Sequence, residues 1–467
     1  MSNSLVGVKG PFANMSVVQR ANFETLVGKM GVTVDVLLTQ NPVFKRGLLA
    51  LNNDNYTPPE RTPWGGEEIP KLQGKSPQVV GEFWANSGHE KFPSGMVVSV
   101  DGQELTIPLN RLSEIFPGEV SGKQNVDDLD NKMPFLVKLL NSGSWMPYKE
   151  GALVTMLEEL ESGFDVRRDW KEDLGVKTYT DLLEHNNHEL HLGLSYLEGA
   201  LEKAGVKGLA KKLQDLHTEM LTKNLSVQVH PPKGYATDKP SKTEAWYVVD
   251  AEPGAGIYLG LKDGVTKEAF EAAARRGEDV TRFLNFVEAK PGEIFYIPAG
   301  TIHAIGAGLL LVEPQETSET TFRVYDYGRK DKDGNPRELH VDDSIATIDW
   351  DAPRGDALVQ SLLRTPIVLQ EGGPGLARYE QLVKETDFTF NRATFENVGD
   401  VLKNDTSDTE VQGWIVLNGG VAVYDIGGSE PLAEFKQGDP FLFAATFGPY
   451  EIRSTQNNTI VVQTYRA

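Results

Sequence analysis

Two short β-prone segments constrain the fold most, because each places polar side chains inside an apolar run. They are residues 224–248 (NLSVQVHPPKGYATDKPSKTEAWYV) and 292–308 (GEIFYIPAGTIHAIGAG). Gln228 and His230 are two residues apart, and side chains at i and i+2 of a strand point to the same face. Glu244 begins the next apolar run after a stretch rich in turn residues, and His303 follows a Pro/Gly turn. The pattern predicts strands that direct these four side chains into one interior.

The four side chains together are a plausible set of metal ligands. Two imidazoles, a carboxylate and an amide oxygen suit Zn²⁺ and would also accept Fe²⁺, Mn²⁺, Co²⁺ or Ni²⁺. One or two coordination positions would stay open for water or substrate hydroxyls. A lone interior histidine is more often a hydrogen-bonded core residue, but here two of only eight histidines accompany a carboxylate. The sequence predicts one divalent ion, with Zn²⁺ as the first choice, bound by Gln228, His230, Glu244 and His303.

The spacing of these residues resembles the two motifs of the cupin family. The second cupin motif is a glycine, five residues, and then a Pro-x-Gly-x-x-His sequence, which is found here from Gly292 to His303. The first motif has His-x-His, a spacer and Glu. In this chain Gln228 replaces the first histidine and the spacer is long. The resemblance implies a small jelly-roll β-barrel with a metal inside.

Further motifs resemble those of type I mannose-6-phosphate isomerases, which are cupins. They are QVHP (228–231), K-x-E (242–244), PAGTxHA (298–304), the stretch 313–323, WGG (64–66), GEFWANSGHEKFPSG (81–95) and MPFLVKLLNS (133–142). The resemblance covers roughly residues 60–142 and 223–330. It departs from the family at Ser318-Glu319, where the family has Ser-Asp, at an insertion directly before QVHP, and in the length of the N-terminal segment.

The resemblance implies a zinc-dependent aldose–ketose isomerase that interconverts mannose 6-phosphate and fructose 6-phosphate through a cis-enediolate. Arg323 would then stabilise the developing negative charge, with a structural ion pair to Asp326 or a phosphate contact as the alternatives. Lys242 and Glu319 are the two candidates for the proton-transfer base, and Lys242 could instead bind the phosphate. Trp64 and His89 match family positions near the pocket mouth, although core packing is the simpler role for Trp64.

Composition narrows the classes of partner. The formal net charge of −21 argues against nucleic acid and anionic membranes as partners. A protein this acidic needs local positive charge to bind a sugar phosphate, and the metal, Lys242 and Arg323 could supply it. The chain has no cysteine, no apolar run of membrane-spanning length and no apolar signal core at its start. We expect a cytoplasmic protein that is either a monomer or a homodimer.

We expect a mainly β protein with helical insertions, made of two cupin (jelly-roll) β-barrels and a helical subdomain. The predicted parts are an N-terminal extension (1–60), a metal-binding barrel (61–142 and 223–330), a helical insertion (143–222) and a second, metal-free barrel (331–467). Helical periodicity also predicts a helix near 266–287, and the charged, turn-rich segment 330–352 indicates a linker or an exposed excursion. His185, His188 and His191 are spaced three residues apart within the insertion; a polar helix face explains them better than a metal site.

Two other functions remain compatible with the sequence. One is an isomerase or epimerase of another sugar or sugar phosphate, if the inserted helices reshape the pocket. The other is a non-catalytic metal cupin that binds a sugar, which the presence of both Lys242 and Arg323 disfavours. An iron-dependent dioxygenase fits less well, because the ligand pattern differs from the usual facial triad.

Overall fold

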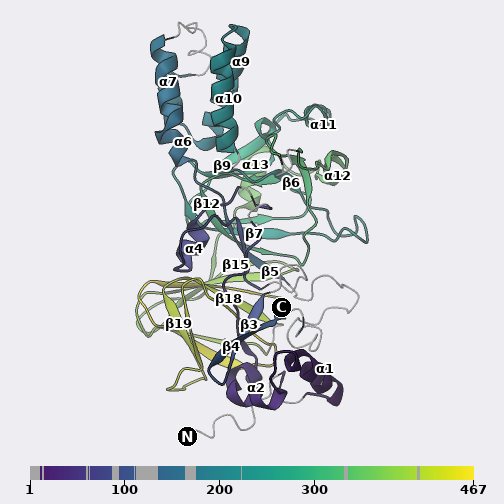
Figure 1. Cartoon of the computed structure of the whole chain (residues 1–467), viewed down its shortest axis with the longest axis vertical. Coiled ribbons are helices and arrows are strands. Elements are labelled where there is room, and N and C mark those ends of the chain that lie inside the picture. The colour runs from purple at the N-terminus through teal and green to yellow at the C-terminus, as the bar shows by residue number, and fades with distance from the viewer. Residues whose placement is uncertain are drawn as a thin grey trace.

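The chain forms two units of paired antiparallel sheets, with a helical arm at one end of the molecule (Figure 1). The computed structural model describes residues 11–12, 15–58, 61–62, 64–86, 94–109, 111, 135–163, 175–221, 223–330, 335–407 and 411–466. His89 lies outside these residues. The predicted class, mainly β with helical insertions, is confirmed.

The first unit consists of two five-stranded sheets. One has the order β10 (Ile294–Ile297), β7 (Glu244–Ala251), β12 (Leu309–Gln315), β5 (Leu136–Asn141) and β2 (Glu82–Trp84). The other has the order β13 (Phe322–Tyr325), β6 (Val227–Val229), β11 (His303–Ile305), β8 (Gly256–Leu261) and β9 (Leu284–Glu288). Trp246 and Leu311 from the first sheet pack with Leu259 and Ile305 from the second in one apolar core. The two sheets therefore pack face to face.

The second unit pairs a seven-stranded sheet with a four-stranded sheet. The larger has the order β1 (Leu48–Ala50), β21 (Pro440–Phe443), β18 (Gln412–Asn418), β23 (Thr459–Tyr465), β16 (Thr389–Phe395), β15 (Arg378–Lys384) and β14 (Ile367–Gln370). The smaller has the order β17 (Val401–Asp405), β22 (Pro449–Ser454), β19 (Gly420–Tyr424) and β20 (Ala433–Lys436). Val312 of the first unit and Phe390 of the second belong to one buried cluster, so the units share a continuous core.

The N-terminal residues pack against the second unit. Strand β1 pairs with β21, with Leu48 opposite Phe443, so an early segment adds an edge strand to the C-terminal sheet. The other elements of this region are α1 (Val17–Gly28), α2 (Val34–Gln40), α3 (Pro42–Arg46), α4 (Glu68–Leu72), β3 (Gly95–Val100) and β4 (Gln103–Pro108). Helix α1 begins with a capping box formed by Ser16 and Gln19.

The helical arm projects from the first unit (Figure 1). Its elements are α6 (Met146–Glu150), α7 (Ala152–Gly163), the 3₁₀ turn η2 (Thr180–Glu184), α9 (Asn187–Lys203) and α10 (Lys207–Leu221). The arm has its own apolar core, in which Leu157, Leu194 and Leu213 are fully buried. Helix α9 starts at a favourable cap, because the Asn186 side chain accepts a hydrogen bond from the Glu189 N–H. Among the helices that the structure describes, none is long and apolar enough to span a membrane.

Two local predictions were wrong. The helix expected near 266–287 ends early: α11 covers only Lys267–Arg275, and η3 (Thr281–Phe283) and strand β9 follow. Gly277, with φ of +69°, interrupts the helical periodicity. The segment expected to be a linker contains α12 (Val341–Thr347), whose Ile345 is buried in a cluster with Phe322. Helix α13 (Gly355–Leu362) then places Leu358 in the core of the first unit.

Candidate metal centre

Strand register brings the motif residues of one sheet into a row. Gln228 on β6 lies opposite His303 on β11 and opposite Arg323 on β13. Directly opposed residues of antiparallel strands project from the same face, so these three side chains lie on one side of the sheet. At the motif turn, Gly300 has φ of +90°, and its N–H donates to the His230 carbonyl oxygen at 2.9 Å. This turn fixes the approach of β11 to the end of β6.

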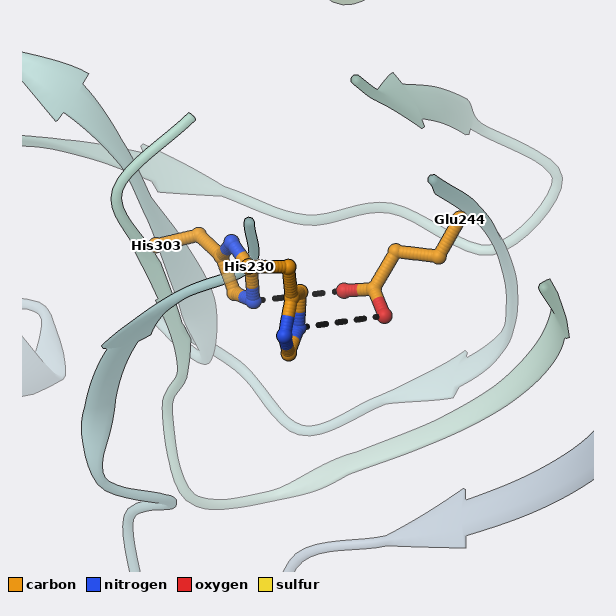
Figure 2. Close-up of side chains that lie close together, drawn as sticks. All are labelled: His230, Glu244 and His303. Carbon is orange, nitrogen blue, oxygen red and sulfur yellow. Dashed lines mark ion pairs between the residues drawn. The ribbon is translucent and has the colours of Figure 1, made fainter. Parts of the chain in front are cut away.

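Glu244 approaches the two histidines from the facing sheet. His303 Nε2 lies 3.2 Å from Glu244 Oε1, and His230 Nε2 lies 3.5 Å from Glu244 Oε2 (Figure 2). None of the three residues is more than 1% exposed. One donor atom from each residue falls within a mutual distance of 4.8 Å. A single ion could therefore contact all three.

Hydrogen bonds set the tautomers of both rings. His230 Nδ1 lies 2.8 Å from the Thr320 carbonyl oxygen, and His303 Nδ1 lies 2.9 Å from the Thr301 carbonyl oxygen. A carbonyl oxygen only accepts, so each Nδ1 carries the hydrogen and each Nε2 presents a lone pair toward Glu244. Burial lowers the pKa of both rings, and the nearby Lys242 ammonium lowers that of His230 further. Both histidines are therefore neutral, the form that binds metal ions.

Glu244 provides the test of whether the group fits a cation. Its carboxylate is fully buried, and among the described residues neither oxygen accepts a hydrogen bond of good geometry. Burial alone would raise the pKa of Glu244, but the Lys242 ammonium holds it below the ordinary value. A buried ionised carboxylate beside two imidazole lone pairs fits a divalent ion. Gln228 Nε2 lies 3.3 Å from His303 Nε2, so its amide must turn over before the oxygen could join the set.

A chain of alternating charges leads away from Glu244. The Lys242 ammonium lies 2.6 Å from Glu244 Oε2 and 3.4 Å from Glu313 Oε1. The same Glu313 oxygen lies 2.9 Å from Lys138, which is 3.9 Å from Glu82. Lys138, Lys242 and Glu313 are each at most 6% exposed. Burial would lower the pKa of Lys138, but the two carboxylates raise it above the ordinary value, so it remains charged.

A cavity of about 640 Å³ opens above this group. Gln228 and Lys242 line the cavity and also contact the His/Glu group. The basic side chains in its wall are Arg61, Lys138, Lys242, Arg323, Lys330 and Arg337, and the carboxylates are Glu82, Glu313 and Glu319. Burial lowers the pKa of Arg337 to about 10, which leaves it charged at neutral pH. The cavity is thus locally cationic within an acidic protein.

The structure places most of the predicted site residues around this cavity. Lys242, Glu319, Arg323 and Trp64 line it, and Trp64 is also 5% exposed and packed in the core. Arg323 Nη1 donates to the Glu338 carbonyl oxygen at 2.9 Å, and its Nε lies 4.0 Å from Asp326 Oδ1. Both expected surroundings of Arg323, the pocket and the Asp326 ion pair, are therefore present.

Sequence reasoning missed several basic residues of the cavity, namely Arg61, Lys138, Lys330 and Arg337. Lys138 had a signal, since a single charge inside the apolar run LVKLL requires a buried partner. The polar-face interpretation of the arm's histidines was wrong for His188 and His191, which are 5% and 2% exposed. Within the described residues, the only group arranged as metal ligands is His230, Glu244 and His303.

Two paired-sheet units, with a buried His/Glu/His group that could hold a metal ion, are consistent with the cupin fold that the motifs predicted. No protein-family model matches the chain. It is 41% identical over 176 residues to mannose-6-phosphate isomerase ManA of Bacillus subtilis (strain 168), which is 37% of this chain and 51% of that relative. The match thus spans about half of the relative's length, and it confirms the resemblance that the motifs indicated.

Solved structures show the same fold. The crystal structure of the mannose 6-phosphate isomerase from Bacillus subtilis matches with a TM-score of 0.58 and 20% identity, over 90% of this chain and 99% of that one. A mannose 6-phosphate isomerase bound with zinc and yttrium matches with a TM-score of 0.52 and 12% identity, over 90% and 99% of the two chains. The arrangement of sheets described above is therefore that of the phosphomannose isomerases.

Proposed function

We propose that this chain is a metal-dependent aldose–ketose isomerase that interconverts mannose 6-phosphate and fructose 6-phosphate. The observation that carries the proposal is a buried metal-type group at the foot of a cation-lined cavity. The similarity to ManA supports the reaction, and the zinc in a structure of the same fold supports the choice of metal. The cationic cavity suits a small anionic substrate despite the net charge of −21.

His230, Glu244 and His303 would hold the ion, and Gln228 would join them after its amide turns. When bound, the ion supplies a positive charge that polarises the sugar carbonyl. The reaction moves a proton between carbon 1 and carbon 2, and its difficult species is a cis-enediolate with a negative oxygen. The Arg323 guanidinium projects from the same sheet face as Gln228 and His303. It would donate to that oxygen and stabilise it.

Two side chains of the cavity are candidates for moving the proton. Lys242 is buried at the base of the cavity and contacts Glu244 and Glu313. Glu319 lines the cavity and is exposed to solvent. A general base must reach the carbon-bound proton and exchange with water. Lys242 is better placed to reach the carbon-bound proton, whereas Glu319 is better placed to exchange a proton with water. The Lys242→Met and Glu319→Gln variants distinguish the two candidates, because loss of the base stops exchange of the carbon 2 proton with solvent.

The phosphate of the substrate would bind to the outer basic residues of the cavity. Lys138 and Lys242 already compensate Glu313 and Glu244. Arg61, Lys330 and Arg337 are the other basic side chains of the wall besides Arg323, and Arg337 also lies 3.4 Å from Asp326. Arginine forks match phosphate oxygens in pairs. The phosphate would then contact these residues while the reacting carbons lie near Glu244.

None of the described residues of the helical arm lines this cavity, whereas Thr57 and Arg61 from the N-terminal part of the chain do. The arm therefore gives no ground for a substrate different from that of the relatives. The lack of cysteine suits a cytoplasmic enzyme, and we propose that location.

A coupled assay on zinc-loaded protein tests the proposal. We expect fructose 6-phosphate to form from mannose 6-phosphate, to stop on chelation and to resume when zinc is restored. Free mannose tests whether the substrate must carry a phosphate. Glucose 6-phosphate tests whether the configuration at carbon 2 matters. Absence of turnover with metal fully loaded, combined with thermal stabilisation by the sugar, would instead establish a sugar-binding metal protein.

A further inference from the structure

A hydrogen-bonded chain of four side chains lies where the helical arm meets the first unit. Glu198 and His191 belong to α9, His217 belongs to α10, and Asp279 lies between α11 and η3. His217 Nδ1 contacts Glu198 Oε1. His217 Nε2 lies 2.7 Å from His191 Nδ1, and His191 Nε2 lies 2.7 Å from Asp279 Oδ2. Both rings are buried, with 2% exposure for His191 and 4% for His217.

These three contacts fix the number of protons in the chain. Each hydrogen bond needs one hydrogen between its two heavy atoms, so three contacts need three hydrogens. Two neutral imidazoles carry only two. With only two hydrogens, at least one contact would have none between its heavy atoms. Two ring lone pairs, or a ring lone pair and a carboxylate oxygen, would then face each other at 2.7 Å or less. The geometry therefore requires a third proton. Both rings are too buried for a water molecule to supply the missing hydrogen bond.

The surroundings decide where the third proton resides. Asp279 Oδ1 accepts hydrogen bonds from the Thr281 N–H at 2.9 Å and from its hydroxyl at 2.7 Å. Burial would raise the pKa of Asp279, but the contacts with His191 and Thr281 lower it to about 2. Burial lowers the pKa of His217. We propose that His191 is a buried proton-binding site, an imidazolium that donates to both His217 and Asp279 and thereby fastens the arm to the first unit.

The other titratable groups at this junction are consistent with a charge on His191. Burial lowers the pKa of His188 to about 4, with Lys262 adding to the effect, so His188 is neutral. Burial raises the pKa of Tyr258 well above its ordinary value, so it is neutral as well. Lys262 approaches Asp279 from the first unit. The two carboxylates of the chain thus enclose one imidazolium.

The junction supports the sheet that carries the metal-type residues. The His188 ring stacks on Phe286 with centroids 5.3 Å apart and meets Tyr258 edge-on at the same separation. Tyr258 lies on β8, which pairs with β11 so that Leu259 is opposite His303. The arm is seen above this sheet in Figure 1. Release of the arm would therefore expose the back of the metal-bearing sheet.

A proton held at the junction makes docking of the arm depend on pH. In an undocked arm, an imidazole exposed to water is neutral above about pH 6.5. Above that pH, docking takes up one proton, so the docking equilibrium weakens roughly tenfold for each pH unit. Below about pH 6.5 both states hold this proton, so its contribution to docking no longer changes with pH.

Hydrogen exchange of the full-length protein, measured peptide by peptide by mass spectrometry from pH 6 to 9, tests the proposal. After correction for intrinsic exchange, we expect protection of α9 and α10 to fall with pH by roughly one power of ten per unit. His191→Gln, which cannot take up a proton, should remove the slope. His185→Gln is the matched control on the arm, because the His185 ring hydrogen-bonds the Asp181 carbonyl oxygen through Nδ1 and takes no part in this chain of contacts, and it should keep the slope.

A second measurement needs no variant. Nitrogen-15 spectra of histidine-labelled wild-type protein at pH 8 should show a ring with both nitrogens protonated, although free imidazole is neutral there. Protection of α9 and α10 that is independent of pH in the wild type would overturn the proposal. So would an unchanged slope in His191→Gln, or spectra in which every ring is neutral at pH 8.

Discussion

The Lys242 ammonium lies 2.6 Å from Glu244 Oε2, closer to that carboxylate than either histidine nitrogen, at 3.2 and 3.5 Å. Lys242 lies two positions before Glu244, which is the first residue of β7, and both side chains enter the same buried interior. Lys242 compensates a carboxylate that would otherwise be a buried, unpaired charge. A bound metal ion would neutralise the Glu244 charge in place of Lys242. The contact between Lys242 and Glu244 would therefore depend on whether metal is bound.

Removal of one imidazole should remove metal and activity together. In His303→Ala, the remaining His230 and Glu244 offer too few donors for a stable site. We expect zinc measured by elemental analysis to fall from one equivalent to near zero, and turnover to fall by roughly a hundredfold or more. His185→Ala, which changes a histidine of the helical arm, should retain both. A full equivalent of zinc in His303→Ala would show that the ligand assignment is wrong.

The buried Lys138–Glu313 pair should show strong coupling. Lys138→Met leaves Glu313 with a weaker partner, since Lys242 is 3.4 Å away, and should cost about 3 kcal/mol of unfolding free energy. In the double variant with Glu313→Gln, part of that loss should be recovered because the buried charge is gone. Urea denaturation of the two single variants and the double variant measures the coupling.

The exposed Lys290→Met is a control that should change the unfolding free energy by no more than about 0.5 kcal/mol. Simple additivity of the two single variants would contradict a direct Lys138–Glu313 interaction.

Local patterns predicted the parts of the site that depend on strand geometry. Gln228, His230 and His303 could be placed because alternation and a turn motif fix their direction within a few residues. Lys138 could not be given a partner, since Glu313 is far along the chain and only the register of β5 against β12 brings them opposite. The cavity cation Arg337 was missed because its segment was interpreted as a linker.

The fold shows the same limit. A mainly β chain follows from short apolar runs between turns, but the pairing of β1 with β21 joins residues near opposite ends of the sequence. The helix predicted near 266–287 failed where Gly277 and the following β-prone run outweighed the helical spacing. The domain boundaries and the oligomeric state stay predictions.

Arg323 and Arg337 should affect different kinetic constants. Arg323 shares a sheet face with Gln228 and His303, so Arg323→Ala should keep the metal and lower kcat by roughly a hundredfold. Arg337 lines the cavity farther along the chain and would bind phosphate, so Arg337→Ala should mainly raise KM for mannose 6-phosphate. Steady-state kinetics with zinc content measured in parallel distinguish these effects. Arg276→Ala, which removes a surface pair with Glu278, is the control.

The buried His188 should make the protein less stable in mild acid. Its two ring nitrogens have no hydrogen-bond partner in the part of the chain that the structure describes, and burial lowers its pKa to about 4. The unfolded chain binds a proton below about pH 6.5, whereas the folded chain does not until about pH 4. Stability is therefore lost as pH falls through this window, by about 2 kcal/mol between pH 7.5 and 5 for this one group.

His188→Phe should remove that contribution, because phenylalanine keeps a ring between Tyr258 and Phe286 and cannot take up a proton. We expect the free energy of unfolding of the variant at pH 7.5 to match or exceed that of the wild type, since the two unpartnered ring nitrogens are removed. Its advantage should grow by about 2 kcal/mol at pH 5. Urea denaturation of both proteins at pH 7.5 and pH 5 measures the difference in unfolding free energy and its change with pH. An equal pH dependence in the two proteins would mean that His188 is protonated in the folded state.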